Sequence, residues 1–93
     1  MSERKKINFD GKKLNLEEIS VGDILIRNRD SMIIINELVI EKKDNRVVII
    51  CRGSSFPVIY REYDISSNGD VSLRDAHARE NKTYLKQLEE AQL

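Results

Sequence analysis

Two neighbouring segments are rich in isoleucine and valine: MIIINELVI at residues 32–40 and RVVIICR at residues 46–52. Because β-branched side chains lose rotamer freedom in a helix, both segments favour strands over the rival helical interpretation. Ile33-Ile34-Ile35 is apolar on both faces, so we expect a central strand that is covered on both sides. The polar pair Asn36-Glu37 interrupts the run and indicates a bulge or a strongly bent corner.

The connection between these two strands, EKKDN at residues 41–45, leaves their register open. A two-residue Asp44-Asn45 loop sets Lys43 opposite Arg46. A four-residue loop pairs Glu41 with Arg46 instead. The two registers differ by two residues, so both keep the same side chains on each face of the sheet.

The N-terminal part carries a strong turn signal at Asp10-Gly11. Both residues tolerate positive φ, so a type I′ turn is expected to join a hairpin between residues 7–9 and residues 12–14. Asn15 is placed to cap a single helical turn. Gly22 then predicts a bend or bulge before the next strand.

That next strand is expected at residues 24–27 and is followed by a turn at residues 28–31. The chain then returns along residues 32–35. Pairing across this turn places Ile24 opposite Ile35, so that the isoleucines of the two strands face one another.

The strand at residues 57–65 is followed by a turn whose length can be predicted from the pairing of the strands on either side of it. A three-residue loop at residues 67–69 pairs Ile65 with Val71, which sets apolar against apolar. A two-residue loop would set the same isoleucine against a serine. We therefore predict the three-residue loop, with Gly69 in the left-handed region at a bulge.

Together these strands predict a mainly β fold for residues 1–73. We expect a small, strongly bent barrel, or a bent antiparallel meander, of about five to seven strands, because such a sheet must hide its edges and its apolar face. The run from Leu16 to Leu25, with Val21-Gly22-Asp23 at its centre, resembles the entry to many small SH3-like barrels. That resemblance implies a small-barrel fold and implies no activity.

Residues 74–93 predict a C-terminal helix, because they contain no Gly or Pro and few β-branched residues. Ser72 is expected to cap it, with Asp75 in its first turn. We favour docking of the helix on its own barrel, through Tyr84, Leu85 and Leu88, which predicts a monomer. The alternative is a helix-mediated homodimer with Asn81 at a core position.

The chain has 93 residues, of which 40% are hydrophobic, and is therefore expected to form a single domain, residues 1–93. We predict that eight aliphatic residues of the strands form most of its core: Ile24, Ile26, Ile33, Ile35, Val39, Val48, Ile50 and Ile59.

Composition and motifs argue against several classes of protein. The 16 basic and 16 acidic residues cancel, which disfavours a protein that depends on non-specific affinity for nucleic acid. No apolar run is long enough for a membrane span or a signal peptide, so we expect a cytoplasmic protein without membrane contact. The single Cys51 and single His77 provide no metal cluster, and no phosphate-binding loop is present. We expect no catalytic residue, no metal and no cofactor, with His77 in the first helical turn and Cys51 a small buried residue.

A basic and aromatic group remains as the candidate binding site. Between Asn45 and Arg61 the chain carries no acid, and the tentative binding residues are Arg46, Arg52, Tyr60 and Arg61. Arginine and tyrosine favour binding surfaces because each offers a large contact area with a polar tip. The leading interpretation is a non-catalytic protein-interaction module, such as a small bacterial or phage accessory protein that docks on a larger protein. The alternative is a small barrel that binds nucleic acid through these residues, and an enzyme or small-ligand binder is third.

Overall fold

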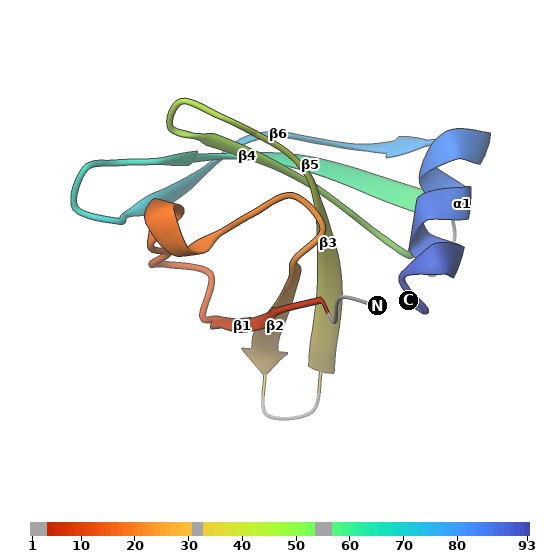
Figure 1. Ribbon diagram of the computed structural model, residues 1–93, viewed down its shortest axis with the longest axis horizontal. Coiled ribbons are helices and arrows are strands. Elements are labelled where there is room, and N and C mark those ends of the chain that lie inside the picture. The colour runs from red at the N-terminus through yellow and green to blue at the C-terminus, as the bar shows by residue number, and fades with distance from the viewer. Residues whose placement is uncertain (1–3, 31–32, 54–56) are drawn as a thin grey trace.

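The computed structural model describes residues 4–30, 33–53 and 57–93, and within them the fold is mainly β (Figure 1). One mixed sheet has its strands in sequential order, and a short 3-10 helix and one α-helix complete the fold. The elements are β1 (Lys6–Phe9), η1 (Leu16–Glu18), β2 (Ile24–Asp30), β3 (Ile33–Lys43), β4 (Arg46–Cys51), β5 (Val58–Ile65), β6 (Val71–Arg79) and α1 (Lys82–Glu90). The predicted β fold with a C-terminal helix is confirmed, as a bent sheet that does not close into a barrel.

The predicted hairpin around Asp10-Gly11 is wrong, because β1 pairs in parallel with β2. The turn itself forms: the Asp10 carboxylate accepts hydrogen bonds from the backbone N–H groups of Lys12 (2.7 Å) and Lys13 (3.0 Å), and Gly11 has φ 86°. These bonds hold the pKa of the exposed Asp10 carboxyl below its ordinary value. The turn leads the chain away from β1 instead of back along it.

The chain after this turn contacts the opposite edge of the sheet. The Leu14 N–H donates to the Gly69 carbonyl at 2.9 Å, and the Val71 N–H donates to the Lys12 carbonyl at 2.9 Å. A single bridge between Lys13 and Asp70 results, reinforced by an ion pair of 2.8 Å between their exposed side chains. This bridge links the two edges of the bent sheet at one end only.

The β2–β3 hairpin has a different register from the predicted one. Ile24 pairs with Leu38 instead of Ile35, because residues 28–30 belong to β2 instead of the predicted turn, and Asp30 pairs with Ile33. The end of the predicted turn, Ser31, lies outside the described residues. The hairpin extends beyond the rest of the sheet (Figure 1), and for that reason Ile33 is 47% exposed instead of central.

The β3–β4 connection is the two-residue loop, one of the two alternatives that the sequence leaves open, with Lys43 opposite Arg46 and Asp44 at φ 54°. A bulge between Val39 and Glu41 then shifts the register by one residue, which neither predicted register contained. The strand that is covered on both faces is therefore β4, whose residues from Val47 to Cys51 are all buried.

The β5–β6 hairpin confirms the predicted register. Ile65 pairs with Val71, Tyr63 pairs with Leu73, and Gly69 has φ 85°. The expected end of this strand is wrong, since β6 continues to Arg79 along the whole of β5.

The helix consequently starts later than predicted, and Ser72 does not cap it. Asn81 is the N-cap: its side-chain oxygen accepts hydrogen bonds from the N–H groups of Thr83 (2.9 Å) and Tyr84 (3.1 Å). Asn81 thus caps its own helix, whereas the alternative of a helix-mediated homodimer places it at a core position between two helices. Leu88 is completely buried against the protein's own sheet, so the predicted docking of the helix is confirmed.

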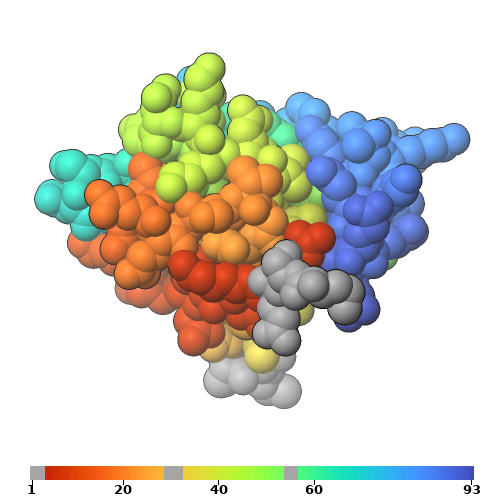
Figure 2. Space-filling view, in the orientation of Figure 1, coloured from red at the N-terminus to blue at the C-terminus, as the bar shows by residue number. Residues whose placement is uncertain are grey.

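Each face of the sheet supports its own core. We call the face that holds Leu25, Val39 and Ile49 the inner face; the chain around η1 covers part of it, as the orange segment in Figure 2 shows. The outer face holds Ile24, Leu38 and Ile50 and is covered by α1. Of the predicted core, Ile24, Val39, Val48 and Ile50 are buried, Ile26, Ile35 and Ile59 are half-buried, and Ile33 is exposed.

Replacement of Gly69 by alanine should destabilise the protein more than replacement of Gly11. Both glycines have φ near 86°, where an L side chain costs about 1–2 kcal/mol. At Gly69 a Cβ would also lie 2.9 Å from the Leu14 carbonyl oxygen, whereas at Gly11 nothing lies within 4 Å. Urea unfolding of G69A and G11A measures the difference in their free energies of unfolding. Equal losses of stability would show that the close approach of the Leu14 carbonyl does not constrain residue 69.

Candidate interaction site

The sheet is open between β1 and β6 beyond the bridge, and a small cavity lies in this opening. Its volume is about 120 Å³, and residues from both sides of the opening line it: Phe9, Gly11, Arg27, Arg61, Tyr63, Val71 and Leu73. Leu73 stands at its rim with 57% of its surface exposed. The cavity therefore combines an apolar rim with two guanidinium groups.

A buried polar cluster on the inner face adjoins the cavity. Glu37 is completely buried and accepts a hydrogen bond from Arg61 Nη1 at 2.9 Å. The Tyr63 hydroxyl donates to the same carboxylate, at 3.0 and 3.1 Å from its two oxygens. Arg27 Nε lies 3.7 Å from Glu37 Oε2. We call Arg27, Glu37, Arg61 and Tyr63 the inner polar cluster.

Burial dominates the protonation behaviour of this cluster. It raises the pKa of the Glu37 carboxyl above its ordinary value, against the opposing effects of Arg27, Tyr63 and Arg61. Burial and the nearby Glu37 carboxylate likewise raise the pKa of Tyr63. The Tyr63 hydroxyl therefore stays protonated and serves as a donor.

Arg27 is the member of the cluster with unused donors. Its side chain is 19% exposed, and its Nε is buried without a hydrogen-bond partner among the described residues. A guanidinium carries five N–H donors in a planar fork, and Glu37 already receives hydrogen bonds from Arg61 and Tyr63. In the described part of the chain, two arginines thus face one carboxylate, which leaves an excess of one positive charge beside the cavity.

The β6 strand provides an edge next to this cavity. Within the described residues the sheet ends at β6, so the outer side of this strand from Ser72 onwards has no strand partner. Ala76 pairs with Arg61 and Ala78 with Ile59, so both alanines lie on the inner face, and both are exposed. Small side chains leave room there for another strand to approach.

The structure does not bring the four predicted binding residues together. Arg46 lies at the β3–β4 turn, with Nε 3.8 Å from the Asp64 carboxylate. Arg52 follows β4 and donates its Nε–H to the Leu93 carbonyl at 2.5 Å. Tyr60 is on the outer face, opposite Ile50, whereas Arg61 is on the inner face, opposite Ile49. These residues do not form one continuous surface.

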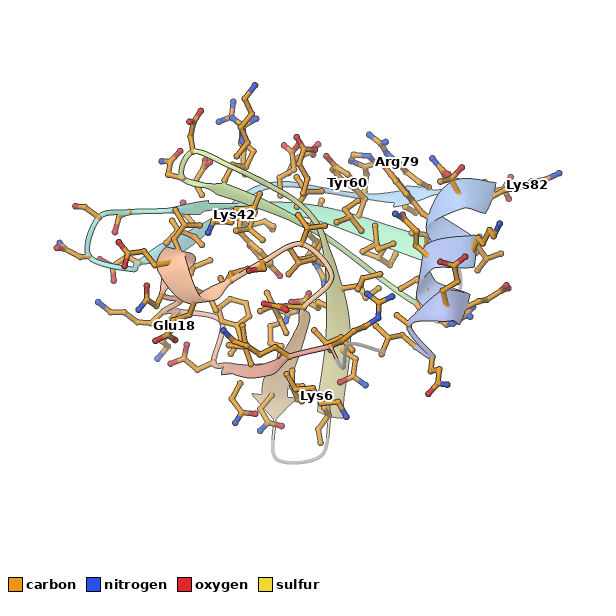
Figure 3. The ribbon with its side chains drawn as sticks, in the orientation of Figure 1. Lys6, Glu18, Lys42, Tyr60, Arg79 and Lys82 are labelled. Atoms are coloured by element: carbon orange, nitrogen blue, oxygen red, sulfur yellow. The ribbon has the colours of Figure 1, made fainter. Side chains whose placement is uncertain are left out.

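Tyr60 belongs to a second cluster, beside the start of α1 (Figure 3). Its ring stacks on His77 at 4.8 Å, and the Arg79 guanidinium lies 4.3 Å from the ring centroid. Its hydroxyl donates to Glu62 at 2.6 Å, and burial together with this carboxylate raises its pKa. The cluster joins β5, β6 and the helix, and Tyr84 stacks at 6.2 Å from Tyr60.

His77 and Cys51 lie on opposite faces of the sheet, so the structure does not bring them together as a nucleophile and base. His77 lies in β6 on the outer face instead of the first helical turn, with Nδ1 3.2 Å from the Asp75 carboxylate. Cys51 is buried, as expected, and its Sγ accepts a weak hydrogen bond from Arg61 on the inner face. Burial raises the pKa of this thiol, and the charge of the Glu37 carboxylate raises it further, so the thiol stays protonated.

Of the inner polar cluster, the sequence predicts only Arg61 as a site residue. The sequence places Glu37 in an interruption of an apolar run, Arg27 and Leu73 on strands, and Tyr63 just beyond the candidate binding residues, and it groups none of them into one site. The available signal was the position of Glu37, since an acid between apolar residues of a strand needs a buried partner.

Comparison with known proteins adds no assignment: no family model, no curated protein and no solved structure matches the chain. The one α-helix within residues 4–30, 33–53 and 57–93 is too short and too polar to cross a bilayer. In the same part of the chain, no three His, Cys, Asp or Glu side chains are grouped to hold a metal ion.

Proposed function

We propose that this protein is a non-catalytic protein-interaction domain that receives an extended segment of a partner along β6. The observation that carries the proposal is the outer side of β6, which from Ser72 onwards has no strand partner among the described residues and lies next to the exposed Leu73 and the cavity. An unpaired strand edge presents backbone N–H and C=O groups in the spacing that another strand requires. Side chains of the added strand would then lie on the inner face.

The residues around this edge favour a peptide over other ligands. Leu73 offers exposed apolar surface, and Ala76 and Ala78 leave the inner face shallow. The balanced overall charge gives no broad attraction to nucleic acid. A cytoplasmic partner is part of the proposal, because a chain with a single cysteine has no internal disulfide framework of the kind common in small secreted domains.

The proposal is tested by selection of binding peptides from a displayed random library, with peptides of about ten residues, the length of a long strand. Selected peptides are synthesised, and their Kd values are measured by fluorescence anisotropy. Leu73→Ser and Ala78→Gln should each weaken binding by about tenfold, because both change the surface that the peptide contacts.

Val21→Ser is the matched control, since Val21 is 61% exposed and lies before β2 instead of on β6. It should leave the Kd within about twofold. The proposal fails if no peptide is enriched, or if the selected peptides bind all variants equally. Salt-sensitive binding of a labelled oligonucleotide that Arg52→Ala abolishes would instead favour the nucleic-acid alternative.

A further inference from the structure

We infer that the cavity between β1 and β6 is a carboxylate site, which receives an Asp or Glu side chain of the peptide bound along β6. This inference rests on the proposed function and specifies the chemistry of its ligand. It follows from the juxtaposition of two guanidinium groups, one internal carboxylate and a small opening at the rim of the sheet.

The charge balance of the site favours an anion. Arg27 and Arg61 both line the cavity, and among the residues that the structure describes Glu37 is the one acid that pairs with them. Glu37 is itself completely buried and does not line the cavity, so an entering group meets guanidinium groups first. A single carboxylate would neutralise the one excess positive charge.

The hydrogen-bonding capacity of the site agrees with its charge. Arg27 Nε is buried beside Glu37, and no side-chain hydrogen bond of Arg27 is found in the described part of the chain, so its terminal N–H groups are left to donate to a carboxylate in a bidentate arrangement. The Tyr63 hydroxyl is already engaged by Glu37, so Arg27 is the principal donor for a ligand. A cavity of about 120 Å³ accommodates a carboxylate with its adjoining methylene group, with Phe9 and Val71 beside the aliphatic part.

The position of the site connects it to the strand edge. Leu73 forms both the rim of the cavity and part of β6. Alternate side chains of an added strand point to the same face, so those that point inward near Leu73 lie above the cavity. An acidic residue at one such position would reach Arg27, and its neighbours two positions away would lie on Leu73 and the alanines.

The first test uses a small probe and does not depend on a peptide partner. N-acetyl-glutamate N-methylamide and the corresponding glutamine compound are titrated into the whole 15N-labelled protein, and the Nε–Hε signals of arginine are recorded. The glutamate compound should shift the Arg27 signal saturably, and the glutamine compound should not. Equal shifts from both compounds, or none from either, would overturn the inference.

Two further arms identify the source and the site of the anion. Inorganic phosphate should shift the Arg27 signal less than the glutamate compound; an equal or larger shift would contradict a carboxylate site. Arg27→Gln should abolish the shift of the remaining Arg61 signal, whereas Arg52→Gln, as matched control, should leave both signals responsive. Because the glutamate and glutamine probes are compared on the wild-type protein, the result stands even if R27Q folds poorly.

The peptide arm separates this inference from the proposed function. In peptides selected for binding, replacement of the acidic residue by its amide should weaken the Kd by about tenfold, the loss expected for a charge-assisted hydrogen bond. If these peptides still depend on Leu73 and Ala78 but tolerate the amide, the proposed function stands and the carboxylate site is wrong. If no peptide binds while the glutamate probe still shifts Arg27, the carboxylate site stands and the strand-addition proposal is wrong.

Discussion

Replacement of Arg61 by alanine should cost about 3 kcal/mol in the free energy of unfolding, even though Arg61 reaches the surface. Removal of one partner of a buried ion pair typically costs about 3–5 kcal/mol, because the remaining charge is left uncompensated. The low end applies here, since Arg61 is 21% exposed and Arg27 remains near Glu37. The matched control is Arg46→Ala, whose half-exposed pair with Asp64 should contribute less than about 1 kcal/mol.

The loss of unfolding free energy in R61A should also depend on pH, and it should be smaller at acidic pH. Burial already raises the pKa of Glu37 above its ordinary value of 4.5, and removal of Arg61 takes away a charge that lowers it. The cost belongs to the ionised carboxylate, so it is complete above the folded-state pKa and decreases as the pH falls through that pKa. R61A should therefore lose less stability, relative to the wild type, at about pH 5 than at about pH 7.5. Urea unfolding at both pH values measures this, and a loss that grows on acidification would contradict the cluster.

Replacement of Leu88 by alanine should cost about 2–5 kcal/mol, because it leaves a cavity between α1 and the outer face of the sheet. Leu88 is completely buried against a core that includes Ile50 and Val58. Lys86→Ala on the exposed side of the same helix should change stability by less than about 0.5 kcal/mol. Thermal or urea unfolding compares the two variants.

The same variant distinguishes docking of the helix from pairing between two copies. If α1 serves only its own sheet, L88A should be less stable and unchanged in mass by light scattering. A variant with wild-type stability that changes from dimer to monomer would show that the helix pairs with a second copy instead. The proposed monomer would then be wrong.

Local chemistry predicted some parts of this fold well. The β5–β6 register followed from matching Ile65 with Val71 across a loop that ends in Gly69, and both features are present. The cap at Asn15 was predicted for the same reason, since a side chain and a backbone N–H two residues away decide it. In each case the residues that determine the structure are close in sequence.

Other parts depend on partners that are distant in sequence. The Asp10-Gly11 turn forms as a turn, but the chain after it pairs with the start of β6. The segment SLRDAHAR at residues 72–79 contains good helix formers, yet it is a strand because β5 pairs with it along its length. Glu37 meets Arg61 and Tyr63 across separations of 24 and 26 residues, so no local pattern revealed the inner polar cluster.

The central claim, that a partner strand binds along β6 over the inner face, is tested most directly by mapping a selected peptide on the wild-type protein by NMR. We expect 15N–1H shifts concentrated in β6 and in the cavity residues, from Val71 to Ala78 and at Arg27, together with slower amide exchange along β6 in the complex. Shifts confined to the outer face around Tyr60, or to the region of Arg46 and Arg52, with β6 unchanged, would contradict the claim.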